Sequence, residues 1–298
     1  VMATDQNEWC ILGAVADEDF TIGRYLKDVG ELLAGVTDSP RLEAELLLGL
    51  VLRRTRAYLH AHTEDQLSKA DRVTFEALVR QRFSGMPIAY ITGVREFWSM
   101  PLRVNRSSLI PRPETELLVE QALTHIPDED DIRVLDLGCG CGPISLAIAT
   151  ERPKAFVTGV DISPGALRLA RLNRKIMKID NVEFMESNWF DAVRGNKYHC
   201  VVTNPPYVIN KDEYMMAGDL RFEPPEALAA GDDGLSAIRA IIDRAHNYIV
   251  RQGWMLIEHG SEQRRAVAKL LEAQRYYDIA CYQDAAGHDR LTECRFVE

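Results

Sequence analysis

From residue 132 onward, short apolar segments of strand length alternate with helical segments, and this alternation is the feature that most constrains the fold. The expected strands cover residues 132–138, 155–161, 182–186, 198–204, 253–260, 278–282 and 291–297. Helices are expected over residues 143–151 and 164–176. Such alternation predicts an α/β fold whose mainly parallel sheet is covered by helices on both faces. The closing pair of strands, with no helix assigned between them, indicates one antiparallel edge.

The first third of the chain predicts a small helical bundle. Apolar residues at helical spacing indicate a first helix, namely Tyr25, Leu26, Val29, Leu32 and Leu33. A second helix is expected over residues 39–52, with Ser39 as its N-cap and Pro40 at its first position. A third is expected over residues 69–83. A bundle of this kind is equally consistent with a binding module and with a structural one.

Composition argues against several classes of function. The net charge of −10 counts against non-specific binding to a phosphate backbone, and we interpret the basic stretches 51–56 and 168–178 as solvated surface rather than local binding patches. No apolar run reaches the roughly 18 residues that a membrane span needs, and residues 1–20 carry no secretory leader. No C-x-x-C pair occurs among Cys10, Cys139, Cys141, Cys200, Cys281 and Cys294. We therefore expect reduced thiols in a cytoplasmic protein.

A glycine-rich loop follows the first expected strand of the sheet. Glycines at 138, 140 and 142 are followed by Pro143 where a dinucleotide fingerprint would place its third glycine. Asp161 ends the next strand about 20 residues later, where an acid accepts hydrogen bonds from ribose hydroxyls. This combination favours an adenosine ligand without a pyrophosphate, for which S-adenosylmethionine is the obvious candidate, over an ordinary tight turn. Asn188 and Trp189 are candidates for adenine contacts, although Trp189 is equally consistent with a core position.

The segment "VVTNPPYVIN" ends a strand with an Asn, two prolines and a Tyr. Pro205 and Pro206 stop regular structure and hold Asn204 in an extended conformation, so the segment predicts a stiff loop that presents an amide and an aromatic ring. A glycine loop, a ribose acid and N-P-P-Y in this order resemble the class I S-adenosylmethionine-dependent methyltransferases, with a Rossmann-like, mainly parallel seven-stranded sheet. With "IPRPETE", "RFEPPEAL", "IEHG" and the helical bundle, residues 21–298 resemble the bacterial release-factor glutamine methyltransferases, the PrmC/HemK family.

This resemblance implies transfer of a methyl group to the side-chain amide nitrogen (N5) of the glutamine in the Gly-Gly-Gln motif of class I peptide chain release factors, which modulates translation termination. It places cofactor binding on Gly138, Cys139, Gly140, Cys141, Gly142, Asp161, Asn188, Trp189 and Asn204. It places catalysis and substrate binding on Asn204, Pro205, Pro206 and Tyr207. Two departures from the family are Cys139 and Cys141 in place of Thr or Ser, and Asn188 in place of Asp.

An amide nitrogen is a weak nucleophile because its lone pair is delocalised into the carbonyl. We expect the Asn204 side-chain oxygen and the Pro205 carbonyl to accept its two N–H bonds, with Pro206 stiffening the loop and Tyr207 walling the amide. The rate would then come from positioning and preorganised dipoles. Arg112 and Glu116 are candidates for the substrate entrance, against helix capping and surface pairing as the alternative.

The histidines show no ligand spacing, His259 is interpreted as structural, and we expect no metal. The expected domains are an extension over residues 1–20, a helical substrate-binding domain over 21–84, a linker with a short β-hairpin over 85–112, and a methyltransferase domain over 113–298. We expect a monomer that acts on release factors, without a membrane or a direct nucleic-acid substrate. Two alternatives stay open, namely a nucleic-acid amino-methyltransferase and a non-catalytic module that keeps the cofactor fold.

Overall fold

The computed structural model describes residues 20–210 and 218–296. Contacts divide the chain into a unit that ends at Thr92 and a unit that begins at Gly93, so the division falls inside the segment expected to be a linker. Two features named above lie outside the described residues, namely the extension up to residue 19, which contains Cys10, and the last position of the final expected strand. None of the helices within the described ranges is long and apolar enough to cross a membrane.

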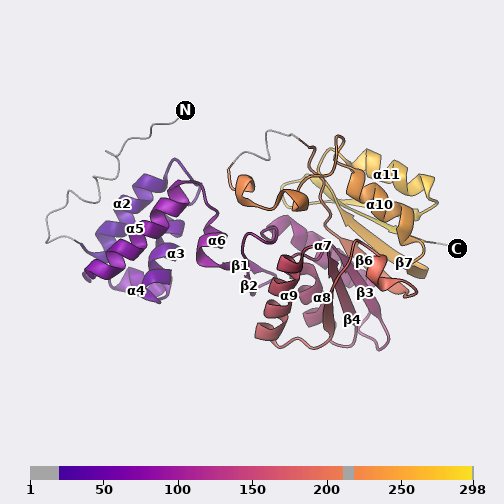
Figure 1. The fold of residues 1–298 in the computed structure, drawn as a ribbon, viewed down its shortest axis with the longest axis horizontal. Helices are drawn as coiled ribbons and strands as arrows, with labels where there is room; N and C mark the ends of the chain where they lie inside the picture. The colour runs from indigo at the N-terminus through magenta and orange to yellow at the C-terminus, as the bar shows by residue number, and fades with distance from the viewer. Residues whose placement is uncertain (1–19, 211–217, 297–298) are drawn as a thin grey trace. The chain divides into compact units, whose positions relative to one another are not determined.

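The first unit is a bundle of helices around its own apolar core (Figure 1). Its helices are α2 (Ile22–Leu33), α3 (Pro40–Leu52), α4 (Arg56–Ala61), α5 (Lys69–Phe83) and α6 (Ile88–Thr92). Thr21 caps α2 by accepting a hydrogen bond from the backbone N–H of Arg24. Ser39 occupies the N-cap position of α3, as predicted, but its side chain does not form a capping hydrogen bond. The short helices α4 and α6 were not predicted.

The second unit contains a seven-stranded sheet in the order β5-β4-β3-β6-β7-β9-β8. Its strands are β3 (Arg133–Leu137), β4 (Phe156–Asp161), β5 (Val182–Glu186), β6 (Tyr198–Thr203), β7 (Ile249–Glu258), β8 (Tyr277–Gln283) and β9 (Asp289–Arg295). The pairings from β5 to β7 are parallel, while β9 runs antiparallel to both β7 and β8. The predicted α/β class, the mainly parallel sheet and the antiparallel edge are therefore confirmed.

Helices cover both faces of this sheet (Figure 1). On one face, α7 (Glu116–His125), α8 (Pro143–Glu151) and α9 (Pro164–Met177) share an apolar core with alternate strand residues such as Val134 and Val157. On the other face, α10 (Ser236–Ala245) and α11 (Arg264–Ala273) pack on the intervening residues, among them Leu135 and Val160. Short 3-10 turns lie at η1 (Pro113–Thr115), η2 (Asp191–Val193), η4 (Leu220–Phe222) and η5 (Pro225–Ala227).

A β-hairpin formed by β1 (Val94–Phe97) and β2 (Met100–Arg103) precedes the sheet and confirms the predicted strand pair. Its apolar side chains join the core of the second unit. Asn173 of α9 joins the hairpin to the glycine loop: its Oδ1 accepts from the N–H of Arg103, and its Nδ2 donates to the carbonyls of Arg103 and Cys141. Asn173 is 1% exposed, so these bonds form away from water and fix the hairpin next to the loop.

Candidate active site

The carboxyl ends of the parallel strands bring the predicted motifs to one edge of the sheet. Leu137 of β3 pairs with Val160 of β4 on one side and with Thr203 of β6 on the other. The residues that follow these positions are Gly138, Asp161 and Asn204. The crevice outside this edge, where connections leave in opposite directions, is where open α/β sheets bind their ligands.

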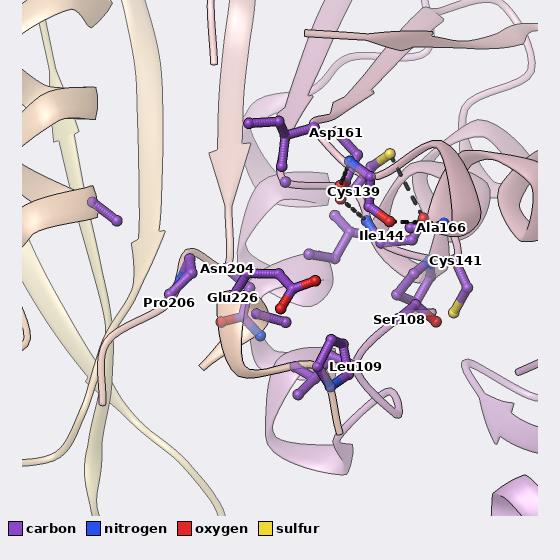
Figure 2. A pocket seen from close by; sticks show the side chains of 18 of the residues that line it. Ser108, Leu109, Cys139, Cys141, Ile144, Asp161, Ala166, Asn204, Pro206 and Glu226 are labelled. Atoms are coloured by element: carbon purple, nitrogen blue, oxygen red, sulfur yellow. Dashed lines mark hydrogen bonds between the residues drawn. The ribbon is translucent and has the colours of Figure 1, made fainter. Parts of the chain in front are cut away.

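A cavity of about 440 Å³ lies at this edge (Figure 2). Figure 2 shows Asp161 and Cys139 on one side of it, with Asn204 and Pro206 on another side. The predicted residues that line this cavity are Gly138, Cys139, Gly140, Cys141, Asp161, Asn188, Trp189, Asn204, Pro206 and Arg112. Gly142, Pro205, Tyr207 and Glu116 do not line it.

The loop after β3 takes a backbone conformation that favours glycine. Gly138 has φ +72° and Gly140 has φ +57°, both in the left-handed region. A Cβ on Gly140 would meet nothing within 4 Å, so the backbone there borders open space. Gly142 serves another purpose, because at φ +88° it begins α8 and a Cβ would lie 3.0 Å from the ring of Phe184. The structure therefore places Gly142 in the packing behind the loop.

Asp161 is tied to this loop by its own side chain. Its Oδ2 accepts a 2.8 Å hydrogen bond from the N–H of Gly140, and its Oδ1 accepts one of 2.8 Å from the N–H of Ser163. Burial raises the pKa of this carboxyl, and the backbone hydrogen bonds from Ser163 and Gly140 act against that rise. A carboxylate has roughly four acceptor sites, more than the backbone N–H groups of Ser163, Gly140 and Ile162 occupy, so the side chain retains the capacity to accept a hydrogen bond from a ribose hydroxyl.

Cys139 and Cys141 line the cavity as neutral thiols. They are 2% and 1% exposed, and no disulfide joins them. Burial raises the pKa of Cys141 to about 12 and that of Cys139 well above its ordinary value. They therefore act as small apolar wall residues, which agrees with the predicted reduced state.

Asn188 and Trp189 follow β5 and line the cavity, with the Trp189 ring next to Gly138. Trp189 has φ +53°, and its carbonyl accepts a 2.8 Å hydrogen bond from the hydroxyl of Ser187. The indole also packs against the core on the α10 and α11 face. Trp189 thus packs against the core and also lines the cavity, and its contact with an adenine stays a prediction.

The N-P-P-Y loop contributes to two adjoining hollows. Asn204 and Pro206 line the large cavity, whereas Pro205 and Tyr207 line a second hollow that also includes Asn204 and Arg112. Asn204 Nδ2 donates a 3.1 Å hydrogen bond to the hydroxyl of Thr115 in η1. Asn204 thus lines both hollows, and the Thr115 hydroxyl fixes the position of its amide nitrogen.

Tyr207 is held in the second hollow by its backbone and its ring environment. Its carbonyl accepts a 3.1 Å hydrogen bond from Gln263 Nε2. Burial raises the pKa of its hydroxyl to about 12, with a further rise from the neighbouring Glu258 and an opposing effect of Arg290. The phenol therefore stays neutral at physiological pH.

Arg112 and Glu116 separate in the structure. The Arg112 guanidinium lines both hollows and forms an ion pair with Glu223, whose other oxygen accepts a 3.0 Å hydrogen bond from the N–H of Ile110. Glu116 accepts a 2.7 Å hydrogen bond from the N–H of Trp98 and so holds the turn of the β1–β2 hairpin. Arg112 therefore borders both hollows and its role at the substrate entrance stays a prediction, while Glu116 has a structural contact away from the cavity.

Several wall residues were not predicted. Among them are Ser107, Ser108, Leu109, Thr115, Ile162 and Glu226. Ile162 directly follows Asp161, lines the cavity and is 62% exposed. Its position after the strand-end acid was the signal available in the sequence.

His259 has the structural contacts that its interpretation required. Its Nδ1 lies 2.9 Å from the carbonyl of Gly260 and its Nε2 lies 2.8 Å from the hydroxyl of Thr292. Over residues 20–210 and 218–296, His, Cys, Asp and Glu do not gather in a group of three or more that would hold a metal ion.

Comparison with known proteins shows the family to which this chain belongs. The family model for the PrmC N-terminal domain matches residues 25–93, and the model for the methyltransferase small domain matches residues 113–231. The release factor glutamine methyltransferase of Coxiella burnetii is 45% identical over 92% of this chain and 99% of its own length. The chain belongs to the release factor glutamine methyltransferase family.

Other similarities agree with this membership. The release factor glutamine methyltransferase of Escherichia coli is 42% identical over 88% of this chain and 94% of its own length. A methyltransferase from Pyrococcus furiosus has the same fold at 14% identity, with a TM-score of 0.51 over 74% of this chain and 96% of its own. The predicted release factor glutamine methyltransferase family and its class I, Rossmann-like fold are thus confirmed.

Proposed function

We propose that this chain transfers a methyl group from S-adenosylmethionine to the side-chain amide nitrogen of the glutamine in the Gly-Gly-Gln motif of class I peptide chain release factors. The observation that carries the proposal is that Asn204 and Pro206 line the same cavity as the loop of Gly138 to Cys141 and Asp161. Similarity to release factor glutamine methyltransferases over nearly their whole length supports the choice of substrate.

The residues of the cavity fit S-adenosylmethionine. The open space beside the Gly140 backbone admits a ligand close to the main chain, and the Asp161 carboxylate is positioned to accept from ribose hydroxyls. Ile162 and Trp189 supply apolar walls for an adenine. When bound, S-adenosylmethionine supplies an electrophilic methyl group on a sulfonium.

The N-P-P-Y loop would hold the acceptor amide. The side-chain oxygen of Asn204 and the carbonyl of Pro205 accept the two N–H bonds of the glutamine amide, which directs its nitrogen toward the cavity. Tyr207, neutral because its pKa is raised by burial, limits movement of the flat amide. Formation of the new N–CH3 bond would break the sulfonium–methyl bond and release S-adenosylhomocysteine. The fixed acceptors would stabilise the positive charge that develops on the amide nitrogen until one N–H proton passes to solvent.

The two units have separate tasks in this proposal. Residues 21–84 bind the protein substrate, residues 85–112 connect the units, and residues 113–298 carry out methyl transfer. The separate apolar core of each unit supports such a division. A cytoplasmic location, a monomeric state and the absence of a direct nucleic-acid substrate belong to the same proposal, and light scattering tests the monomer.

The deciding experiment is transfer of labelled methyl from S-adenosylmethionine to a purified class I release factor. The Gln→Ala variant of its Gly-Gly-Gln motif is the matched control, and DNA and rRNA are offered in parallel. Label on the wild-type factor alone supports the proposal. Label on nucleic acid would indicate that the acceptor is an exocyclic base nitrogen instead of glutamine. No label on any substrate would favour the non-catalytic module.

A further inference from the structure

A buried carboxylate lies next to Asn204 in the neighbouring strand. The parallel pairing of β6 with β7 places Thr203 opposite Ile257, so Asn204 and Glu258 are the next residues on adjacent strands. Glu258 is 2% exposed, and its Oε2 has no hydrogen-bond partner among the described residues. A buried polar atom without a full set of partners is costly to stability, so its position calls for an explanation.

The partners that Glu258 does have belong to the candidate site. The side chains of Thr115 and Asn204 lie close enough to its carboxyl group to favour its charged form and so lower its pKa, against the larger effect of burial. Asn204 Nδ2 also donates to the Thr115 hydroxyl at 3.1 Å, and Thr115 is itself 3% exposed. Glu258, Thr115 and Asn204 thus form one network, in which Glu258 and Thr115 are buried while Thr115 and Asn204 border the cavity.

The chemistry of this network determines which way the Asn204 amide faces. An ionised carboxylate only accepts hydrogen bonds, so the Asn204 group turned toward it is the NH2. Rotating the amide by half a turn would bring Oδ1 against the negative charge and leave Nδ2 without this acceptor. The carboxylate therefore stabilises the one orientation in which Oδ1 is directed away from Glu258.

We propose that Glu258 is a positioning residue, which holds the Asn204 amide so that its Oδ1 accepts a hydrogen bond from the substrate amide. The inference rests on the proposed function, because that function assigns Asn204 to the acceptor glutamine. Glu258 itself does not line the cavity and so acts through Asn204 and Thr115.

Other charged groups also face Glu258. Arg290 of β9 approaches it and is shared with Asp284 through a 3.2 Å ion pair, Glu114 of η1 repels it, and Tyr207 lies beside it. Burial is the largest influence and raises the pKa of Glu258 to about 7, against the effects of Thr115 and Arg290. A protonated carboxyl can donate as well as accept, so it no longer discriminates between the two orientations of the Asn204 amide.

Glu258→Gln tests this role because glutamine has nearly the same shape as glutamate. Like a protonated carboxyl group, its amide can both donate and accept hydrogen bonds, so it does not fix the orientation of Asn204. We expect kcat on the release factor to fall by about 10- to 100-fold, the size of a lost charged hydrogen bond. The KM for the release factor and the Kd for S-adenosylmethionine, measured by calorimetry, should stay within about twofold. The wild-type kcat should decline below a pH of about 7, whereas the variant should show no such decline over that range.

Glu293→Gln is the matched control. Glu293 is also buried, at 5% exposed, but its oxygens lie 2.8 Å from His125 Nε2 and accept from the Tyr282 hydroxyl at 2.8 Å, away from the cavity. We expect wild-type kcat for this variant. If Glu258→Gln fails to fold, Thr115→Val removes the same link from the other side and should give the same selective loss of kcat.

A double variant separates positioning from an independent effect. In an Asn204→Ala background, Glu258→Gln should lower the residual turnover no further, because the group it positions is already gone. The positioning role would be overturned if the kcat losses of the two single variants multiplied in the double variant. It would also be overturned if Glu258→Gln kept wild-type kcat while Asn204→Ala was impaired. A wild-type enzyme that does not methylate release factor would instead overturn the proposed function.

Discussion

The Asp161 carboxylate accepts a 2.8 Å hydrogen bond from the backbone N–H of Gly140, and so the end of β4 is tied to the loop after β3. Asp161→Ala removes this bond together with the acceptor expected for the ribose. We predict that the Kd for S-adenosylmethionine rises by at least about tenfold, the effect of losing one hydrogen bond to a charged group. Calorimetry measures the change, with Asp180→Ala as a surface control. Unchanged affinity would remove Asp161 from the cofactor site.

Asn204→Ala should act on turnover more than on cofactor binding. Removing one fixed group that stabilises developing charge lowers kcat by about 100-fold or more. The Kd for S-adenosylmethionine should change by less than about threefold, because the loop of Gly138 to Cys141 and Asp161 is untouched. Single-turnover kinetics by mass spectrometry checks the first expectation. Wild-type turnover in this variant would contradict the assigned role.

Two glycines of the same loop should respond differently to alanine. Gly142→Ala places a Cβ 3.0 Å from Phe184 at φ +88°, so we predict a loss of about 1–3 kcal/mol in the free energy of unfolding. Gly140→Ala meets no protein atom within 4 Å, so its cost to the fold is limited to about 1–2 kcal/mol for the φ of +57°, and its methyl group enters the cavity. It should therefore weaken cofactor binding more than it destabilises the fold. Urea unfolding and calorimetry on both variants distinguish these effects, and identical profiles would contradict them.

Asp136 should make stability depend on pH. Burial raises its pKa from 3.8 to about 7 despite hydrogen bonds from Ser145, and its Oδ1 has no partner among the described residues. Between these two values the folded state holds a proton that the unfolded state has lost, so the group's contribution to stability falls as pH rises.

The slope from this single group is at most about 1.4 kcal/mol per pH unit, and the change is complete above the folded pKa. Asp136→Asn cannot titrate, so the difference in unfolding free energy between the variant and the wild type should shift in favour of the variant as pH rises from about 4 to 7. Urea titrations at several pH values measure it. Parallel curves would show that Asp136 does not titrate in this window.

Removing the helical unit should separate substrate recognition from cofactor binding. A chain of residues 93–298 keeps the whole sheet core and the cavity. We predict that its Kd for S-adenosylmethionine stays within about threefold, while the KM for release factor rises by at least about tenfold, or 1.4 kcal/mol of lost binding. An equal loss of both would contradict the division of tasks.

The order of strands and helices could be predicted because apolar periodicity reports burial directly. The limits of β5 and α8 coincide with their predicted ranges, 182–186 and 143–151. Strand β7 begins at Ile249, four residues before the predicted start, because an irregularity in its pairing with β6 and a positive φ at Gln252 break the alternation. Helices α10 and α11 were missed although both have apolar faces, and α4 and α6 are too short to give a period.

The residues of the site likewise fall into those that a local sequence motif predicts and those that only the structure reveals. Gly140, Asp161 and Asn204 carry chemistry that a motif can state, and the structure gathers them at one edge of the sheet. Ser108 and Leu109 reach the cavity only because the chain folds back over it, so local sequence gives no signal for them. Glu258 likewise becomes informative only once strand register places it beside Asn204.

The neutral state of Cys139 and Cys141 bears on how the cavity tolerates oxidants. Peroxides attack thiolates, and the raised pKa of both residues leaves almost no thiolate at physiological pH. The two sulfur atoms in the cavity wall thus react slowly with oxidants. We therefore expect this loop to be no more sensitive to oxidation than a loop with serine or threonine at the same positions.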